Sequence, residues 1–179
     1  MLRLYFPKVG IHAGAVALFA VLMQAAAIFV PFGAEDAPKR LLFEISYVLL
    51  LFFVAVNWRR LGIAIIGLGL LLNFLPIIAN GGLMPVTSGT LARIDEAHVL
   101  EGLKEGDAIP YQKNVWRERE NTHLYFLSDR LVWDNPFHLR VFSIGDVIVA
   151  GGLILTLGDL FLPRLQRRPQ DGASPEVSV

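Results

Sequence analysis

One carboxylate inside a predicted membrane helix is the group in this sequence best placed to do chemistry. Asp146 lies about one turn inside the apolar run 141–162. A charged side chain costs about 2.5 to 3.5 kcal/mol at the centre of a membrane helix and less near its end, so it normally has a partner. Asp146 is therefore expected either to bind a proton, ion or substrate, or to join a network of neighbouring polar groups.

Two short polar motifs are expected to meet beside this carboxylate. The third apolar helix runs outward and is ended by Asn80, Gly81 and Gly82, while the fourth runs inward from about Val141, with Ser143 near its start. A ligand site at this boundary would comprise Asn80, Gly81, Gly82, Ser143 and Asp146. The alternative is a cap-like network that locks the outer ends of the two helices. We favour the network, because helix termini commonly use these residue types.

The sequence predicts no catalytic residue, metal site or cofactor. The histidines of the outer segment, His98, His123 and His138, match no metal-binding spacing. The chain contains no phosphate-binding GxxxxGK[ST] loop and no GxSxG nucleophile motif. Cysteine is absent, which excludes disulfides and thiolate ligands. An enzyme is thus the less favoured interpretation.

Apolar residues gather in blocks long enough to cross a membrane. Hydrophobic residues make up 54% of the 179 residues, and most charges lie between the blocks. About 20 helical residues cross a hydrocarbon core of about 30 Å. We predict an all-α membrane protein with one membrane domain, residues 1–162, and four transmembrane helices at about 11–30, 41–56, 61–79 and 141–162.

The charges indicate how these helices are oriented. Cytoplasmic ends of membrane helices are enriched in Lys and Arg. Seven such residues fall on one side: Arg3, Lys8, Arg59, Arg60, Arg164, Arg167 and Arg168. The roughly 60 residues of the outer segment, 81–140, carry nine acidic and seven basic residues. Both termini are therefore predicted to be cytoplasmic, and residues 163–179 are predicted to form a disordered cytoplasmic tail.

The outer segment is predicted to fold as an extracytoplasmic cap over the helix ends. Apolar residues at mostly helical spacing indicate a helix from Leu91 to Lys104. Residues 107–121 are polar and predict a surface loop. Short apolar stretches after residue 123 could rest at the membrane boundary. The segment is thus expected to pack on the bundle.

Polar and small residues within the spans predict contacts between helices. His12, Gln24 and Asn73 are expected to form interhelical hydrogen bonds. Glycines in the third and fourth spans allow close packing, either within the chain or against another subunit: Gly62, Gly67, Gly69, Gly151 and Gly152. Arg59 and Arg60 are explained by their place in a cytoplasmic turn between two spans. The functional alternative is that they bind a lipid headgroup.

Two separated motifs resemble an uncharacterised family of bacterial multi-pass membrane proteins, known only as a domain of unknown function. They are the ANGGLMPV stretch at 79–86 and the FSIGD stretch at 142–146. The resemblance spans about residues 2–162. It implies a bacterial inner-membrane location, and it supplies no activity.

Together these features predict a non-enzymatic accessory or scaffold subunit, or a small-ligand binder. The alternative is a small oligomeric transporter or membrane-embedded enzyme that uses Asp146. The expected partners are the lipid bilayer and another membrane protein or further copies of the chain. Zero net charge and the lack of a basic patch argue against nucleic acid.

Overall fold

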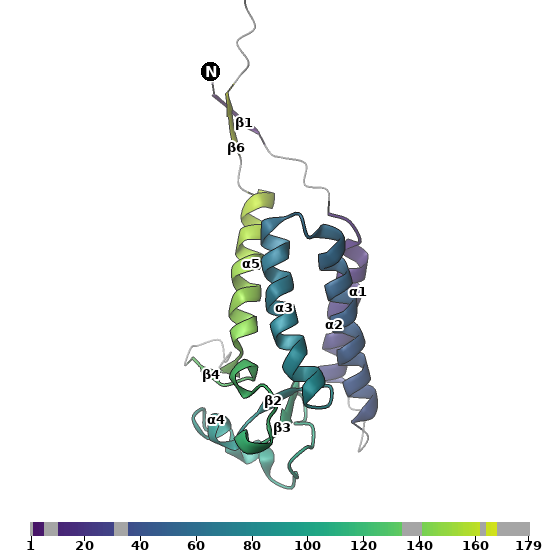
Figure 1. The fold of residues 1–179 in the computed structure, drawn as a ribbon, viewed down its shortest axis with the longest axis vertical. Coiled ribbons are helices and arrows are strands. Elements are labelled where there is room, and N and C mark those ends of the chain that lie inside the picture. The colour runs from purple at the N-terminus through teal and green to yellow at the C-terminus, as the bar shows by residue number, and fades with distance from the viewer. Residues whose placement is uncertain (1, 6–10, 31–35, 134–140, 162–163, 168–179) are drawn as a thin grey trace, which may run out of the picture.

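Long helices lie side by side, with a folded cap at one end (Figure 1). A computed structural model describes residues 2–5, 11–30, 36–133, 141–161 and 164–167. The long helices are α1 (Gly14–Phe29), α2 (Ala37–Asn57), α3 (Leu61–Ala79) and α5 (Ile144–Phe161). The described residues between α3 and α5, 80–133 and 141–143, form the cap.

Three of these helices, α2, α3 and α5, are long and apolar enough to cross a membrane. The prediction for α3 matches its bounds, residues 61–79. Helix α2 starts four residues before its prediction, with a proline in its first turn, where the missing N–H costs nothing. Helix α1 has only 16 residues, because Ala13 takes a left-handed conformation (φ 55°) instead of continuing the predicted span toward residue 11.

The helices pack in chain order, α1 on α2, α2 on α3, and α3 on α5. The side of α5 away from α3 is largely exposed, as expected for a surface that faces lipid. A common apolar core joins the helices to the cap. It runs from Ala20 and Tyr47 through Ile77 to Leu83 and Val115. The cap is therefore part of the same folded unit as the helices.

Glycines bring α3 and α5 into backbone contact. Gly62 and Gly69 lie two turns apart on α3, opposite Gly152 and Gly145 on α5. A Cβ atom on Gly69 would lie 2.6 Å from the carbonyl oxygen of Gly145, and one on Gly152 would lie 2.7 Å from that of Gly62. The prediction of close packing is correct for these residues, whereas Gly151 has nothing within 4 Å of its Cβ position.

The cap contains short strands and helical turns, which corrects the expectation of an all-α chain. Strand β2 (Met84–Val86) pairs in parallel with β3 (Asn114–Trp116), and β4 (Leu131–Val132) pairs antiparallel with β5 (Val141–Phe142). The predicted loop at 107–121 contains β3, whose Val115 is fully buried. Burial of Val115 and pairing with β2 therefore make a strand in a segment whose local composition is polar.

The helix predicted from Leu91 to Lys104 is absent. Helix α4 (Ser88–Ala92) ends after five residues, and a separate 3₁₀ turn occupies Ala97–Leu100. Asp95 between them has a positive φ of 58°, which interrupts a right-handed helix. Two further 3₁₀ turns lie at Arg119–Asn121 and Tyr125–Leu127. The apolar stripe instead packs around Ile109.

Basic residues at the outer end of α2 hold the cap by its backbone. Lys39 Nζ donates to the carbonyl oxygen of Ile109 at 3.0 Å. The Arg40 guanidinium donates to the carbonyl oxygens of Gly81 at 2.7 Å and Gly106 at 2.8 Å. These two side chains therefore provide hydrogen-bond donors for carbonyl oxygens in the turns of the cap.

A two-stranded pair lies beyond the opposite ends of the helices (Figure 1). Strand β1 (Leu2–Tyr5) pairs antiparallel with β6 (Arg164–Arg167), which joins the two terminal segments. The predicted disordered tail, 163–179, thus contains a strand at 164–167. Its remaining residues lie outside the described part of the chain.

Candidate functional site

The site begins with a capping box at the start of α5. The Asp146 N–H donates to Ser143 Oγ at 3.0 Å, and Asp146 Oδ2 accepts from the Ser143 N–H at 3.0 Å. This reciprocal pair satisfies backbone donors that a helix start leaves without partners. A carboxylate in the first turn also lies at the positive end of the helix dipole. The Ser-x-x-Asp spacing thus determines where α5 begins.

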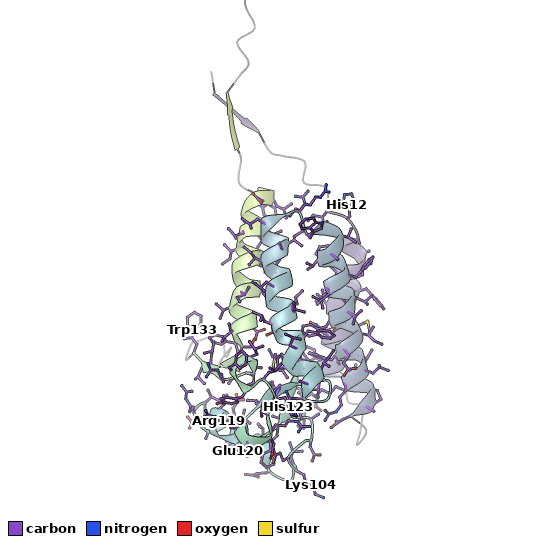
Figure 2. All side chains as sticks on the ribbon, viewed as in Figure 1. His12, Lys104, Arg119, Glu120, His123 and Trp133 are labelled. Carbon is purple, nitrogen blue, oxygen red and sulfur yellow. The ribbon has the colours of Figure 1, made fainter. Side chains whose placement is uncertain are left out.

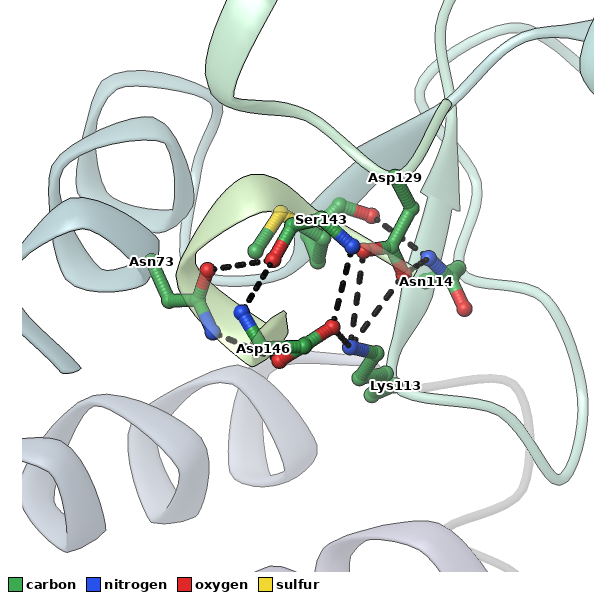
Figure 3. Close-up of polar contacts among 7 residues, drawn as sticks. Asn73, Lys113, Asn114, Asp129, Ser143 and Asp146 are labelled. Carbon is green, nitrogen blue, oxygen red and sulfur yellow. Dashed lines mark hydrogen bonds and ion pairs between the residues drawn. The ribbon is translucent and has the colours of Figure 1, made fainter. Parts of the chain in front are cut away.

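Asn73 links this capping box at the start of α5 to α3 (Figure 3). Ser143 Oγ donates to Asn73 Oδ1 at 2.6 Å, and Asn73 Nδ2 donates to Asp146 Oδ1 at 2.7 Å. Both Asn73 and Ser143 are buried. The contact is possible because Gly145 has no side chain, since a Cβ there would collide with Asn73. The predicted interhelical role of Asn73 is correct.

Lys113 reaches the same carboxylate from the cap. Its Nζ lies 3.0 Å from Asp146 Oδ2 and 3.3 Å from Asp129 Oδ2. Asn114 Nδ2 donates to Asp129 Oδ2 at 2.9 Å, next to strand β2. One ammonium is thus shared by two carboxylates from different segments. The cluster connects α3, α5 and the cap at the cap end of these helices.

The two acidic groups outnumber the single ammonium, and burial makes that imbalance costly. Asp129 is 1% exposed, whereas the Lys113 and Asp146 side chains are 27% and 32% exposed. Burial raises the pKa of Asp129 above its ordinary value, although Lys113 opposes the shift. Burial alone would lower the pKa of Lys113, but the carboxylates of Asp129 and Asp146 outweigh it and raise that pKa. Lys113 is therefore an ammonium ion across the physiological pH range.

A cavity of about 350 Å³ opens beside Lys113, between the outer end of α1 and the cap. Apolar side chains form slightly more than half of its wall, and Lys113, Asn114, Gln112 and Glu96 supply the polar part. The remaining lining residues are Ile28, Val86, Leu91, Ile94, Tyr111 and Val141. The cavity thus combines an apolar wall with a charged cluster that lies partly open to it.

The sequence matches the family described as a family of unknown function, DUF5317, over residues 8–157. The chain belongs to this family. That finding confirms the resemblance to an uncharacterised family. No curated protein and no solved structure matches the chain. The DUF5317 assignment therefore identifies no activity, and any function must be argued from the geometry.

In this DUF5317 chain the five predicted site residues divide between two places. Ser143 and Asp146 join the Lys113 cluster. Asn80 instead binds the cap backbone, accepting from the His123 N–H at 3.0 Å and donating to the His123 carbonyl oxygen at 2.9 Å. The other two predicted residues, Gly81 and Gly82, have positive φ angles of 86° and 94° and form the turn after α3. They approach Arg40 and Glu44 of α2.

Sequence reasoning missed Lys113, Asn114 and Asp129. Lys113 comes from a stretch predicted as a polar surface loop, and no local pattern places it against α5. Only Asp146's need for a partner signalled that a cation was to be found. Among the described residues no group of three or more His, Asp or Glu side chains could hold a metal ion. His138 lies outside the described residues.

Proposed function

We propose that this protein is a non-enzymatic membrane protein that binds a small amphiphile with a positively charged group beneath its cap. All four long helices cross a bacterial inner membrane in this proposal, with both termini in the cytoplasm. Three helices of membrane-crossing length and the basic residues at the cap-distal end support that arrangement. The observation that carries the ligand proposal is the cavity beside the Lys113 cluster.

The position of the cavity favours a ligand that is partly apolar. Ile28 lies at the outer end of α1, and Leu91 and Ile94 belong to the cap. A molecule in the outer part of the bilayer would reach this space directly. Ligand pockets typically combine an apolar wall with a few polar groups that fix orientation.

The charges favour a cationic group on that ligand. Lys113 lies between Asp129 and Asp146, so the cluster carries one excess negative charge when both carboxyl groups are ionised. Glu96 adds another carboxylate to the cavity wall. An ammonium group in the cavity beside Glu96 would offset this excess and compensate the cost of burying carboxylates.

Binding, rather than chemistry, is supported by the way the polar groups are engaged. Asn73, Ser143 and Asp146 are bonded to one another or to Lys113. Such a network holds its members in fixed positions and favours recognition.

The test uses the full chain in a neutral detergent, with octylammonium as the cationic probe. Octyl sulfate and octyl glucoside serve as anionic and neutral probes of similar length. We expect octylammonium to bind most tightly by titration calorimetry, and Glu96→Gln to weaken it several-fold. Glu101→Gln, an exposed cap substitution with the same charge change, is the control and should bind like the wild type. Equal binding of all three probes would contradict the proposal.

An accessory or scaffold role is the second candidate. It is supported by the exposed face of α5, where Gly151 has no neighbour within 4 Å of its Cβ position. Purification in mild detergent with native mass analysis separates the two. A stoichiometric protein partner would favour the accessory role, whereas a homogeneous chain with a bound small molecule would favour ligand binding.

A further inference from the structure

The helix ends opposite the cap carry a second cavity, of about 510 Å³. It is lined by His12, Ala55, Val56, Asn57, Trp58, Arg59 and Arg60. Figure 2 shows His12 at this end of the helices, far from the labelled cap residues. The cavity therefore lies at the other boundary of the helical region from the Lys113 cluster.

We propose that this inner cavity binds the phosphodiester headgroup of an anionic phospholipid. Two arginines in consecutive positions border it, and a guanidinium matches phosphate oxygens with two parallel N–H donors. Trp58 is 63% exposed beside them, as expected for an aromatic ring at a membrane interface. The cavity thus combines a phosphate-binding charge with an interfacial anchor.

Hydrogen bonds between the Asn57 side chain and the backbone hold this cavity in shape. Asn57 is buried, and its amide group makes two hydrogen bonds to the backbone of His12, one accepted from the N–H at 3.0 Å and one donated to the carbonyl oxygen at 2.9 Å. The same Nδ2 donates to the carbonyl oxygen of Phe53 at 2.9 Å. The entrance to α1 is therefore fixed against the end of α2, which places His12 beside the arginine turn.

The start of α3 adds to the attraction for an anion. Arg60 is its N-cap residue, no side chain caps this end, and its first turn contains no acidic residue. The first amides of a helix carry partial positive charge and favour a nearby phosphate. Among the described residues at this end of the helices, the acidic one is Asp159, in the last turn of α5. Asp159 does not line the cavity. The local charge therefore favours an anion.

A headgroup fits this position better than a soluble phosphate. Val56 lines the cavity and is 43% exposed, and Phe52, one turn nearer the cap on the same face of α2, is 53% exposed. Acyl chains attached to a phosphate in the cavity would lie along this surface. A free phosphate ion would gain nothing from it.

The experiment measures lipid binding to the full chain, delipidated in neutral detergent, by native mass spectrometry. Phosphatidylglycerol is titrated against phosphatidylcholine of the same chain length, and inorganic phosphate is tested as a competitor. We expect phosphatidylglycerol to bind at least about tenfold more tightly, and Arg59→Gln to remove most of that preference. Inorganic phosphate should not displace the lipid.

The matched control is Arg93→Gln, which removes one exposed positive charge from the cap. It should retain the preference for phosphatidylglycerol. Equal binding of the two lipids, or an unchanged preference in Arg59→Gln, would overturn the proposal. Displacement by inorganic phosphate at equal concentration would also overturn it, because the ligand would then be a soluble anion. Thermal unfolding of both variants confirms that each is folded in the assay.

Discussion

Helices α3 and α5 are joined in a different way from α1 and α2. The α3–α5 pair touches backbone to backbone through glycines and is closed at its cap end by a charged cluster. The α1–α2 pair packs through side chains such as Ala20, Phe43 and Leu50, and is closed at the end away from the cap by a neutral amide, Asn57. Each pair thus has one polar fastening, at opposite ends of the molecule.

The difference follows from how far apart the paired helices are in the chain. Helices α1 and α2 are consecutive, so a short connection already keeps them together. Helices α3 and α5 are separated by the whole cap, and their association fixes where the cap begins and ends. A fastening that includes Lys113 from the cap joins all three parts at once. The charged cluster therefore couples cap folding to helix packing.

Removing the cluster's cation should have the largest effect. Lys113→Met leaves Asp129 and Asp146 without their ammonium, and breaking a buried ion pair costs about 3 to 5 kcal/mol. We expect a large fall in the thermal unfolding midpoint in detergent at pH 7.5. If the variant matches the wild type, the cluster does not hold α5 to the cap.

The pH dependence of this variant provides its own control. The pKa of Asp129 is already raised by burial, and removing Lys113 raises it further. Each proton taken up by a carboxylate removes the cost of an unpaired charge, so the deficit of Lys113→Met should shrink between pH 7.5 and pH 5. The raised pKa of Lys113 keeps the wild-type ammonium charged throughout this range. A deficit independent of pH would point to lost packing instead.

A methyl group at the glycine contact tests the other part of the α3–α5 fastening. In Gly69→Ala the new Cβ would lie 2.6 Å from the Gly145 carbonyl oxygen and 2.8 Å from the Val149 amide nitrogen, so the helices must separate. We expect a loss of about 1 to 3 kcal/mol in stability, measured by thermal unfolding in detergent.

Gly151→Ala is the matched control on the open face of α5. Nothing lies within 4 Å of its Cβ position, and alanine favours the helix by about 1 kcal/mol over glycine. This substitution should be neutral or slightly stabilising. Equal losses at both glycines would mean that the close contact at Gly69 does not set the effect.

The neutral fastening of the α1–α2 pair should be weaker. Asn57→Ala removes the hydrogen bonds to His12 and Phe53, each worth about 0.5 to 1.5 kcal/mol. We expect a loss of about 1 to 2 kcal/mol and faster hydrogen exchange at the start of α1. Asn121→Ala, which removes exposed hydrogen bonds to Glu105, is the control and should change little. Unchanged exchange near His12 would contradict the role of Asn57.

The sequence predicts local features of this comparison well. Apolar run lengths locate the long helices, and the glycines of α3 indicate close packing. The fourth apolar run, predicted at about 141–162, contains α5, which begins at Ile144. These features succeed because they depend on residues within one or two turns of each other.

The sequence does not predict the contacts that join distant segments. The chain between Lys113 and Asp146 includes strands β4 and β5. Only the folding of the cap brings Lys113 and Asp146 together. The sequence predicts Asn80 beside Asp146 because it places both at the same ends of neighbouring helices, yet Asn80 binds the His123 backbone. The predicted helix at 91–104 fails for a similar reason, since its apolar residues pack around Ile109 without needing a continuous helix.

The smallest effect is expected for Asp129, the cluster's second carboxylate. Asp129→Asn leaves Lys113 and Asp146 as a balanced pair, and an amide oxygen can still accept from Asn114. We expect a loss of about 1 kcal/mol or less at pH 7.5, well below that of Lys113→Met. Thermal unfolding of both variants in the same detergent provides the comparison. A loss as large as that of Lys113→Met would show that both carboxylates are needed.

The sign of the pH effect shows whether the ionised Asp129 carboxylate destabilises or stabilises the folded chain. A carboxyl group whose pKa is raised by folding holds its proton more tightly in the folded chain than in the unfolded chain. It therefore adds stability at low pH, and that stability is lost as the pH rises through the folded pKa. Wild type should exceed Asp129→Asn by more at pH 4.5 than at pH 8. A gap that instead widens with pH would mean that the ionised form of Asp129 stabilises the cluster.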